Sequence, residues 1–194
     1  FSTFGGATDR GAAGAEEYQR QKDKLVTALA GLDAHVLGLM EVQNNAGTVA
    51  DLLAALNLVV KDRYAVVPDP VGGYPAAGTD ADYIRCLLLY RPSSLSLAGA
   101  CRMDTDAAWS LPGSTPTPLR FPLAQTFEET ESGECFTVCV NHWKSKSSSG
   151  ATGADVDQND GQASYNDLRR RQAARLVVWL QGIAAEGGES DQII

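Results

Sequence analysis

The sequence has 194 residues, of which 44% are hydrophobic and 21% are charged, a composition typical of a globular domain with its own core. The formal net charge is −8 and the isoelectric point is about 4.7, which argues against a broad basic face that binds nucleic acid by charge alone. No apolar run approaches the roughly 18 to 20 residues that a membrane-spanning helix needs, so we expect a soluble domain.

The first third of the sequence alternates helical and strand patterns. Apolar residues recur at helical spacing over residues 16–31 and again over 48–56. The short runs at 35–40 and 64–67 are nearly all apolar, and the first of them predicts a strand buried on both faces that delivers Glu41 at its far end.

The remaining two-thirds predicts further strands, long loops and one long helix. In chain order we expect a loop at 68–82, a strand at 83–90, a loop at 102–120, strands at 121–127 and 136–140, a mobile loop at 144–160 and a helix at 162–182. The polar turn at 131–134 indicates that the last two strands form a hairpin. The fold class is therefore predicted to be α/β, with two stacked mixed sheets between helices.

The cysteines leave the redox state open. The four of them are compatible with two disulfides in any of three pairings, or with four buried thiols: Cys86, Cys101, Cys135 and Cys139. If one strand carries both Cys135 and Cys139, these two lie too far apart to bond to each other. A zinc site is disfavoured, because the sequence has no CxxC pair and only two histidines.

Two strand ends carry the candidate chemistry. Glu41 follows an apolar strand, where a buried carboxylate needs a cation or another partner, and Mg²⁺ commonly takes only one or two protein carboxylates. Asn141, His142 and Lys144 follow another apolar strand, and this set can move a proton and hydrogen-bond a phosphoryl oxygen. The alternative is that each strand end is only solvated or structural.

Five segments, in this order along the chain, resemble the endonuclease/exonuclease/phosphatase (DNase I-like) superfamily. They are Leu37–Asn44, Tyr83–Pro92, Arg120–Phe127, Phe136–Ser145 and the stretch from Gly161-Gln162 to Tyr165–Arg169, which is similar to the GQ...WNxxR stretch of bacterial extracellular nucleases. The resemblance covers nearly the whole chain. It implies a four-layered α/β/β/α sandwich and hydrolysis of a phosphodiester by water with Mg²⁺, or with Mn²⁺ or Ca²⁺.

The resemblance also assigns roles to individual residues. Glu41 becomes the metal-binding carboxylate, His142 the acid or base beside the scissile phosphate, Asn141 its neighbour in the catalytic segment, and Asp82 an acidic residue that orients a catalytic histidine. Contacts with the substrate phosphates fall to Arg120, Lys144, Asn166 and Arg169. For Asp82 a polar loop position remains open, and for Asn166 and Arg169 capping or solvation of a helix start.

The family's GDxN strand end, its C-terminal Asp and SDH segment and an upstream metal-site Asn have no counterpart here. We therefore expect residues 1–194 to be the N-terminal two-thirds of one domain, inactive alone but active within its full-length parent. Residues 155–161 also resemble an EF-hand loop. Their glycine falls at the seventh instead of the sixth place, so only a looser Ca²⁺ site remains open.

The predicted function is that of a secreted, extracellular or periplasmic endonuclease of low sequence specificity. DNA is the expected substrate, RNA remains open, and the oligomeric state is not predicted. One alternative is a phospholipid phosphodiesterase of the same fold, for which Trp109 and Trp143 are the only aromatic candidates beside the site. The other is a noncatalytic scaffold or binding domain.

Overall fold

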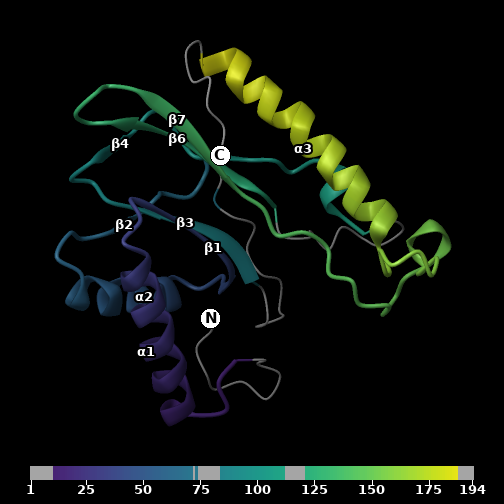
Figure 1. The fold of residues 1–194 in the computed structure, drawn as a ribbon, viewed down its shortest axis with the longest axis horizontal. Coiled ribbons are helices and arrows are strands. Elements are labelled where there is room, and N and C mark those ends of the chain that lie inside the picture. The colour runs from purple at the N-terminus through teal and green to yellow at the C-terminus, as the bar shows by residue number, and fades with distance from the viewer. Residues whose placement is uncertain (1–10, 72, 74–83, 112–120, 188–194) are drawn as a thin grey trace.

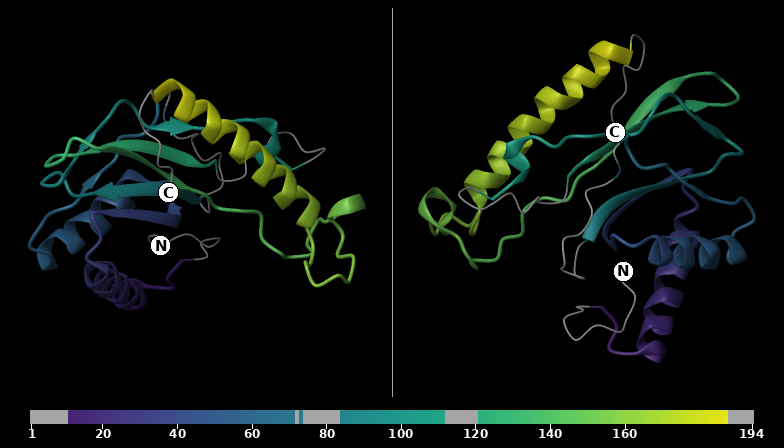
Figure 2. Two further views of the ribbon diagram at one scale, coloured as in Figure 1. Left: turned by 45° about the horizontal axis from the view of Figure 1, so that its top comes forward. Right: turned by 180° about the vertical axis from the view of Figure 1, so that it is seen from behind.

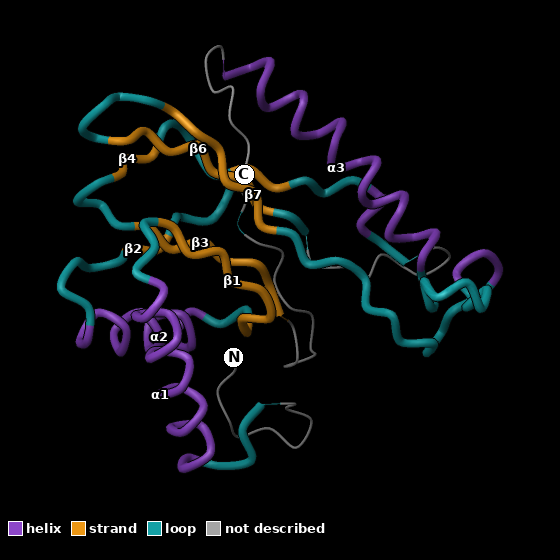
Figure 3. The backbone as a smooth tube through the Cα atoms, viewed as in Figure 1, coloured by secondary structure: helices purple, strands orange, loops and turns teal. Residues whose placement is uncertain are grey.

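The computed structural model describes residues 11–71, 73, 84–111 and 121–187. These form two stacked β-sheets with helices on both outer sides, as the ribbon in Figure 1 and the tube in Figure 3 show. Two of the predicted site residues, Asp82 and Arg120, lie outside the described residues.

Helices α1 (Ala15–Leu32) and α2 (Ala46–Val59) cover the outer face of the first sheet, as their apolar spacing predicts. They bury Val26, Leu29, Leu52 and Leu56 in one core cluster with that sheet. Leu32, which belongs to the same helical pattern, is 65% exposed, because the helix ends there. The side chain of Asn45 caps α2 by accepting the backbone N–H groups of Gly47 and Thr48.

The first sheet has the strand order β1 (Val36–Gln43), β3 (Ile84–Tyr90), β2 (Ala65–Val66). The central strand β3 is buried on both faces: Leu87 and Leu89 pack toward the helices, and Cys86 and Leu88 toward the second sheet. The prediction of a doubly buried first strand is wrong, because β1 pairs only with β3 among the described strands and is partly exposed.

The second sheet is built around β6 (Leu123–Glu129), which forms the predicted hairpin with β7 (Cys135–Val140). On its other side β6 pairs with two short strands that the sequence pattern did not reveal, β4 (Leu95–Leu97) and β5 (Arg102–Met103). All pairings in the described residues are antiparallel, whereas we expected mixed sheets.

The two sheets pack face to face around a core that includes Leu88, Trp109, Phe127 and Val140. Helix α3 (Asn166–Gly187) lies outside the second sheet, where Leu176 packs against this core, so that the left view in Figure 2 shows helices, two sheets and a helix in sequence. The predicted α/β/β/α sandwich is confirmed. None of the described helices meets the length and apolarity that a membrane span requires.

None of the four cysteines, all of which lie in the described residues, takes part in a disulfide. Burial is the main cause that raises the pKa of the Cys101 thiol to about 11 and that of Cys139 to about 12. At neutral pH these two residues are therefore protonated and act as small apolar side chains.

Candidate functional site

Glu41 lies in a β-bulge of β1, not beyond the end of a regular strand. Leu39 pairs with Leu87 and Val42 with Arg85, so β1 advances three residues where β3 advances two. The extra residue is accommodated by Glu41, whose φ of 58° lies in the left-handed region that side chains other than glycine seldom adopt.

The bulge decides which face of the sheet Glu41 occupies. Leu37 and Leu39 point toward the helices, and strict alternation would place residue 41 on the same face. Instead Val42 takes the next helix-facing position and is buried there. The additional residue thus turns Glu41 away from the helix-facing core, where an unpaired carboxylate would be costly.

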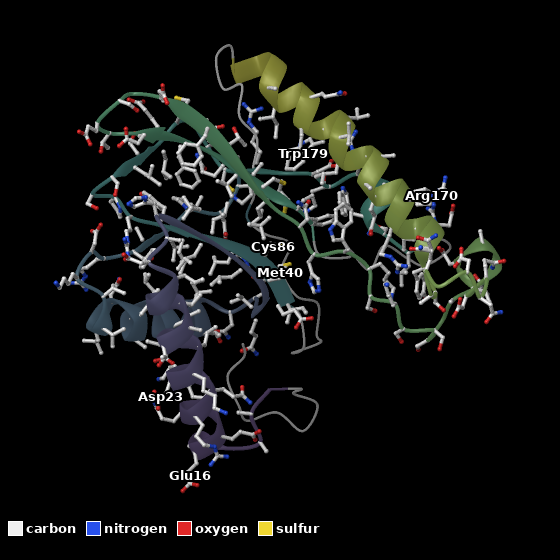
Figure 4. The ribbon with its side chains drawn as sticks, viewed as in Figure 1. Glu16, Asp23, Met40, Cys86, Arg170 and Trp179 are labelled. Carbon is white, nitrogen blue, oxygen red and sulfur yellow. The ribbon has the colours of Figure 1, made fainter. Side chains whose placement is uncertain are left out.

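His142 reaches Glu41 from the other sheet. It stands two residues beyond the end of β7, and its Nε2 lies 3.5 Å from Oε1 of Glu41. The His142 side chain is 19% exposed and that of Glu41 is 66% exposed. Figure 4 labels Met40, the residue of β1 that directly precedes Glu41 and so marks the position of the bulge. The structure therefore brings together two predicted site residues that are 101 positions apart in the numbering (142 − 41).

Asn141 and Lys144 flank His142 in the segment that follows β7. The Oδ1 of Asn141 accepts a weak hydrogen bond from the thiol of Cys139 at 3.7 Å. The ammonium of Lys144 lies 4.0 Å from the centroid of the Tyr165 ring, a cation–π contact that turns it toward the start of α3.

Helix α3 holds the backbone of Lys144 through two side chains. Gln172, which is fully buried, accepts the Lys144 N–H at 3.3 Å, and Arg169 donates to the Lys144 carbonyl at 3.4 Å. Arg169 also donates to the carbonyls of Ser164 and Gln162, each at 2.8 Å. The guanidinium of Arg169 is thus committed to three carbonyl groups, which favours an anchoring role over the predicted phosphate contact.

Asn166 is the first residue of α3 and is half-buried, but Asp155 supplies the cap. The buried carboxylate of Asp155 accepts the N–H of Leu168 at 2.8 Å and lies 3.5 Å from the guanidinium of Arg171. From the sequence, Asp155 belonged to an acidic loop in which only a looser Ca²⁺ site remained open. Helix caps are recognised in a sequence from the residues directly beside the helix start. Asp155 lies more than ten residues before α3, so no sequence signal indicated that it caps this helix.

Three of the four arginines near the start of α3 lie within ion-pair distance of carboxylates, Arg170 through Asp167 at 3.7 Å. Arg171 pairs with Asp167 and Asp155, and Arg175 forms a two-pronged pair with Asp104, at 2.7 and 2.8 Å. Asp104 also accepts the indole N–H of Trp109, whose ring packs 5.8 Å from that of Trp143. The pair of Arg175 with Asp104 therefore helps to dock α3, and these carboxylates lower the positive potential of the arginines.

Glu41 fits a magnesium ion as one oxygen ligand, because its carboxylate is exposed at the site and Mg²⁺ keeps several waters. No group of three or more His, Cys, Asp or Glu side chains in the described part of the chain could enclose a metal ion. The remaining ligands would therefore be water, substrate phosphate or groups outside the described residues.

No protein-family model matches the sequence, and no curated protein matches it either. Solved structures do match. The catalytic domain of human Nocturnin, solved with a bound sulfate anion, is 20% identical with a TM-score of 0.54, over 90% of this chain and 55% of that one. An endonuclease/exonuclease/phosphatase from Bacteroides vulgatus is 15% identical with the same TM-score, over 91% of this chain and 59% of that one.

This chain has the endonuclease/exonuclease/phosphatase fold. At these identities the likeness establishes the fold, as the residue patterns predicted. The chain spans somewhat more than half the length of each of these two structures. Within this fold, the bulge that presents Glu41 and the loop that presents His142 lie at neighbouring ends of the two stacked sheets.

Proposed function

We propose that the protein that carries this chain is a metal-dependent phosphodiesterase, and more specifically an endonuclease of low sequence specificity that acts on DNA outside the cell. The observation that carries the proposal is the pairing of Glu41 with His142 across the two sheets, at 3.5 Å. A carboxylate turned out of the core by a strained bulge, beside an imidazole that can accept or donate a proton, is suited to phosphoryl chemistry.

In this proposal, the residues of this chain have separate roles in metal binding, proton transfer and phosphate binding. Glu41 would hold Mg²⁺ by one carboxylate oxygen, and the ion would polarise the scissile phosphate as a Lewis acid. His142 would hold or donate a proton at its Nε2, the atom that faces Glu41. Asn141, next to it, offers an amide to a phosphoryl oxygen. Contacts to the phosphates and not to the bases give weak sequence preference.

The aromatic residues near the site bear on the phospholipid alternative. Trp109 is fully buried and its N–H is bound to Asp104, so it offers no surface to a lipid. Trp143 is 36% exposed and remains the one aromatic candidate of the two. A single partly covered indole is a small surface for a membrane, which favours the nucleic-acid substrate.

The test is plasmid nicking by the complete polypeptide that contains this sequence, with Mg²⁺ and with EDTA, and with chain 1–194 assayed in parallel. We expect nicking that EDTA abolishes, and a loss of about 100-fold or more in rate for both Glu41→Gln and His142→Ala. Two matched controls, Glu128→Gln on an exposed position of β6 and His35→Ala on the other, exposed histidine, should keep the wild-type rate.

Sphingomyelin-containing vesicles in the same buffers separate the substrates. Lipid turnover without nicking would replace the nuclease by a phospholipid phosphodiesterase. Absence of both activities would favour a scaffold, and equal losses in the control variants would show that the site lies elsewhere.

A further inference from the structure

Gly38 of β1 faces Val140 of β7 across the interface between the two sheets. A Cβ atom added at Gly38 would stand 2.7 Å from Cγ2 of Val140, a separation that real side chains do not tolerate. The backbone of Gly38 is exposed, yet its missing side chain would point into the other sheet and not into solvent.

Val140 has little room to give way. It is 7% exposed and belongs to the core between the sheets, with Trp109, Leu88 and Phe127 in the same cluster. A valine side chain is short and stiff about χ1, so it cannot swing aside as the tip of a longer residue would. An added methyl group would therefore separate the two strands or displace one of them, because packed interiors transmit such strain.

These two residues also lie close to the proposed site along both strands. Gly38 stands three residues before Glu41, and Val140 stands two residues before His142. The pair Glu41–His142 joins the same two strands at 3.5 Å. A change of a few tenths of an ångström at Gly38 thus acts directly on the separation between the two functional groups.

We propose that Gly38 is a positioning residue: the absence of its side chain lets Val140 seat against β1, and this contact sets the distance between Glu41 and His142. The catalytic part of this inference rests on the proposed function, whereas the geometric part does not. A glycine inside an apolar strand is otherwise unfavourable, and close approach of another backbone or side chain is a recognised reason for one.

The experiment is a double-mutant cycle in the complete polypeptide, with the variants Gly38→Ala, Val140→Ala and Gly38→Ala/Val140→Ala. We expect Gly38→Ala to lower kcat for plasmid nicking by about tenfold or more, with KM changed less than about twofold, because misplacement affects the reacting groups and not DNA binding. Removal of the two Val140 methyls makes space for the new Cβ, so the double variant should return to the kcat of Val140→Ala.

Two controls separate positioning from general damage. Gly31→Ala adds the same methyl in α1, where a Cβ meets nothing within 4 Å, and Val138→Ala removes the same atoms from β7 without facing Gly38. Neither should change kcat by more than about twofold, and Val138→Ala should not rescue Gly38→Ala. A double variant as impaired as Gly38→Ala, or Gly38→Ala with the wild-type kcat, would overturn the proposal.

A spectroscopic readout decides the geometric part without any activity. The sequence has only two histidines, so the imidazole signals of His142 and of the distant, exposed His35 can be followed separately by NMR in chain 1–194 at fixed pH. The His142 signals should shift in Gly38→Ala and return in the double variant toward their position in Val140→Ala, while those of His35 stay. If the wild type does not nick DNA but the shifts follow this pattern, the proposed function fails and the positioning contact stands.

If Gly38→Ala does not fold, the comparison of Val140→Ala with the double variant still tests whether Gly38 makes room for Val140. The added Cβ has space in the double variant, so it must fold and give the same His142 signals as Val140→Ala. A double variant that does not fold, or whose His142 signals differ from those of Val140→Ala, contradicts the inference.

Discussion

The conformation of Glu41 ties its chemistry to a local backbone cost. Its φ of 58° lies in the left-handed region, which costs a residue with a side chain roughly 1 kcal/mol relative to glycine. The bulge uses that conformation to move the carboxylate from the helix-facing core to the face where His142 lies. The strain is therefore linked to the position that the proposed chemistry needs.

This strain predicts an inverted order of stability at position 41. In an ordinary strand valine is favoured over glycine, but a β-branched residue is especially unfavourable in the left-handed region. We expect Glu41→Gly to be more stable than Glu41→Val by about 1 to 2 kcal/mol in urea unfolding. Glu128 is the matched control, since it is exposed on β6 and its register with β7 is regular, and there valine should be the more stable. Valine more stable at both sites would show that the bulge does not persist in solution.

The identity of the site residues was accessible from the sequence, but their geometry was not. Glu41 and His142 were recognisable because each follows an apolar strand with polar residues beyond it. The bulge was not, because an insertion of one residue into a strand leaves the apolar pattern on both sides intact. Gly38 gave a usable signal, a glycine within an apolar run, whose physical meaning became clear only with Val140 opposite it.

At the scale of elements, α3 connects the acidic loop before it to the proposed site. Its first turn is capped by Asp155 from that loop, and its next turns hold the backbone of Lys144, two residues after His142. The loop at 144–160, which we predicted to be mobile, includes a 3-10 turn (Gly153–Asp155) and is tied to Tyr165 through the Ser149 carbonyl. The same loop and helix thus hold both the start of α3 and the segment that carries His142 and Lys144.

The cap predicts how this loop responds to mutation and to calcium. Asp155→Ala leaves the N–H of Leu168 without its acceptor and should lower the free energy of unfolding by about 1 to 2 kcal/mol. Asp157→Ala removes an exposed carboxylate from the same loop, so it should lower the free energy of unfolding by only about 0.5 kcal/mol or less. Thermal unfolding with and without millimolar Ca²⁺ completes the test. A calcium-induced rise in Tm that Asp155→Ala abolishes would support the calcium loop instead of the cap.

Regular elements with long apolar patterns were predictable, and short or tertiary-dependent ones were not. The helices α1 and α2 and the β6–β7 hairpin agree with the sequence pattern, since each has several apolar residues at one spacing. The strands β4 and β5, of three and two residues, are too short to show a period, and their pairing depends on β6. The doubly buried strand was placed one strand too early, because an apolar run does not show which strand lies at the centre of a sheet.

For the whole molecule, the charge balance shows how much positive charge the arginines of α3 leave available to an anionic ligand. The chain carries a net charge of −8, and the carboxylates of Asp104, Asp155 and Asp167 pair with arginines of α3. Arg170, whose side chain is 75% exposed, is the arginine of this group that solvent reaches most freely. Under the proposed function, long-range attraction of DNA would therefore be modest, and binding would depend on contacts at the site.

Docking of α3 through Asp104 predicts a specific sensitivity to acid. Burial raises the pKa of this carboxyl, but the hydrogen bonds from Arg175 and Trp109 outweigh it and hold the pKa below its usual value of 3.8. A lowered folded-state pKa contributes stability that is present above pH 3.8 and is lost as the pH falls through the folded value. In urea unfolding at a series of pH values we expect Asp104→Asn to be less stable than wild type at neutral pH. The difference should shrink as the pH falls below 3.8, since the wild type then loses the same charge.

Asp106→Asn, which removes an exposed carboxylate beside the same arginine, should follow the wild-type profile. A difference between wild type and Asp104→Asn that stays constant down to the acid limit would mean that the ionised pair does not hold α3 against the second sheet.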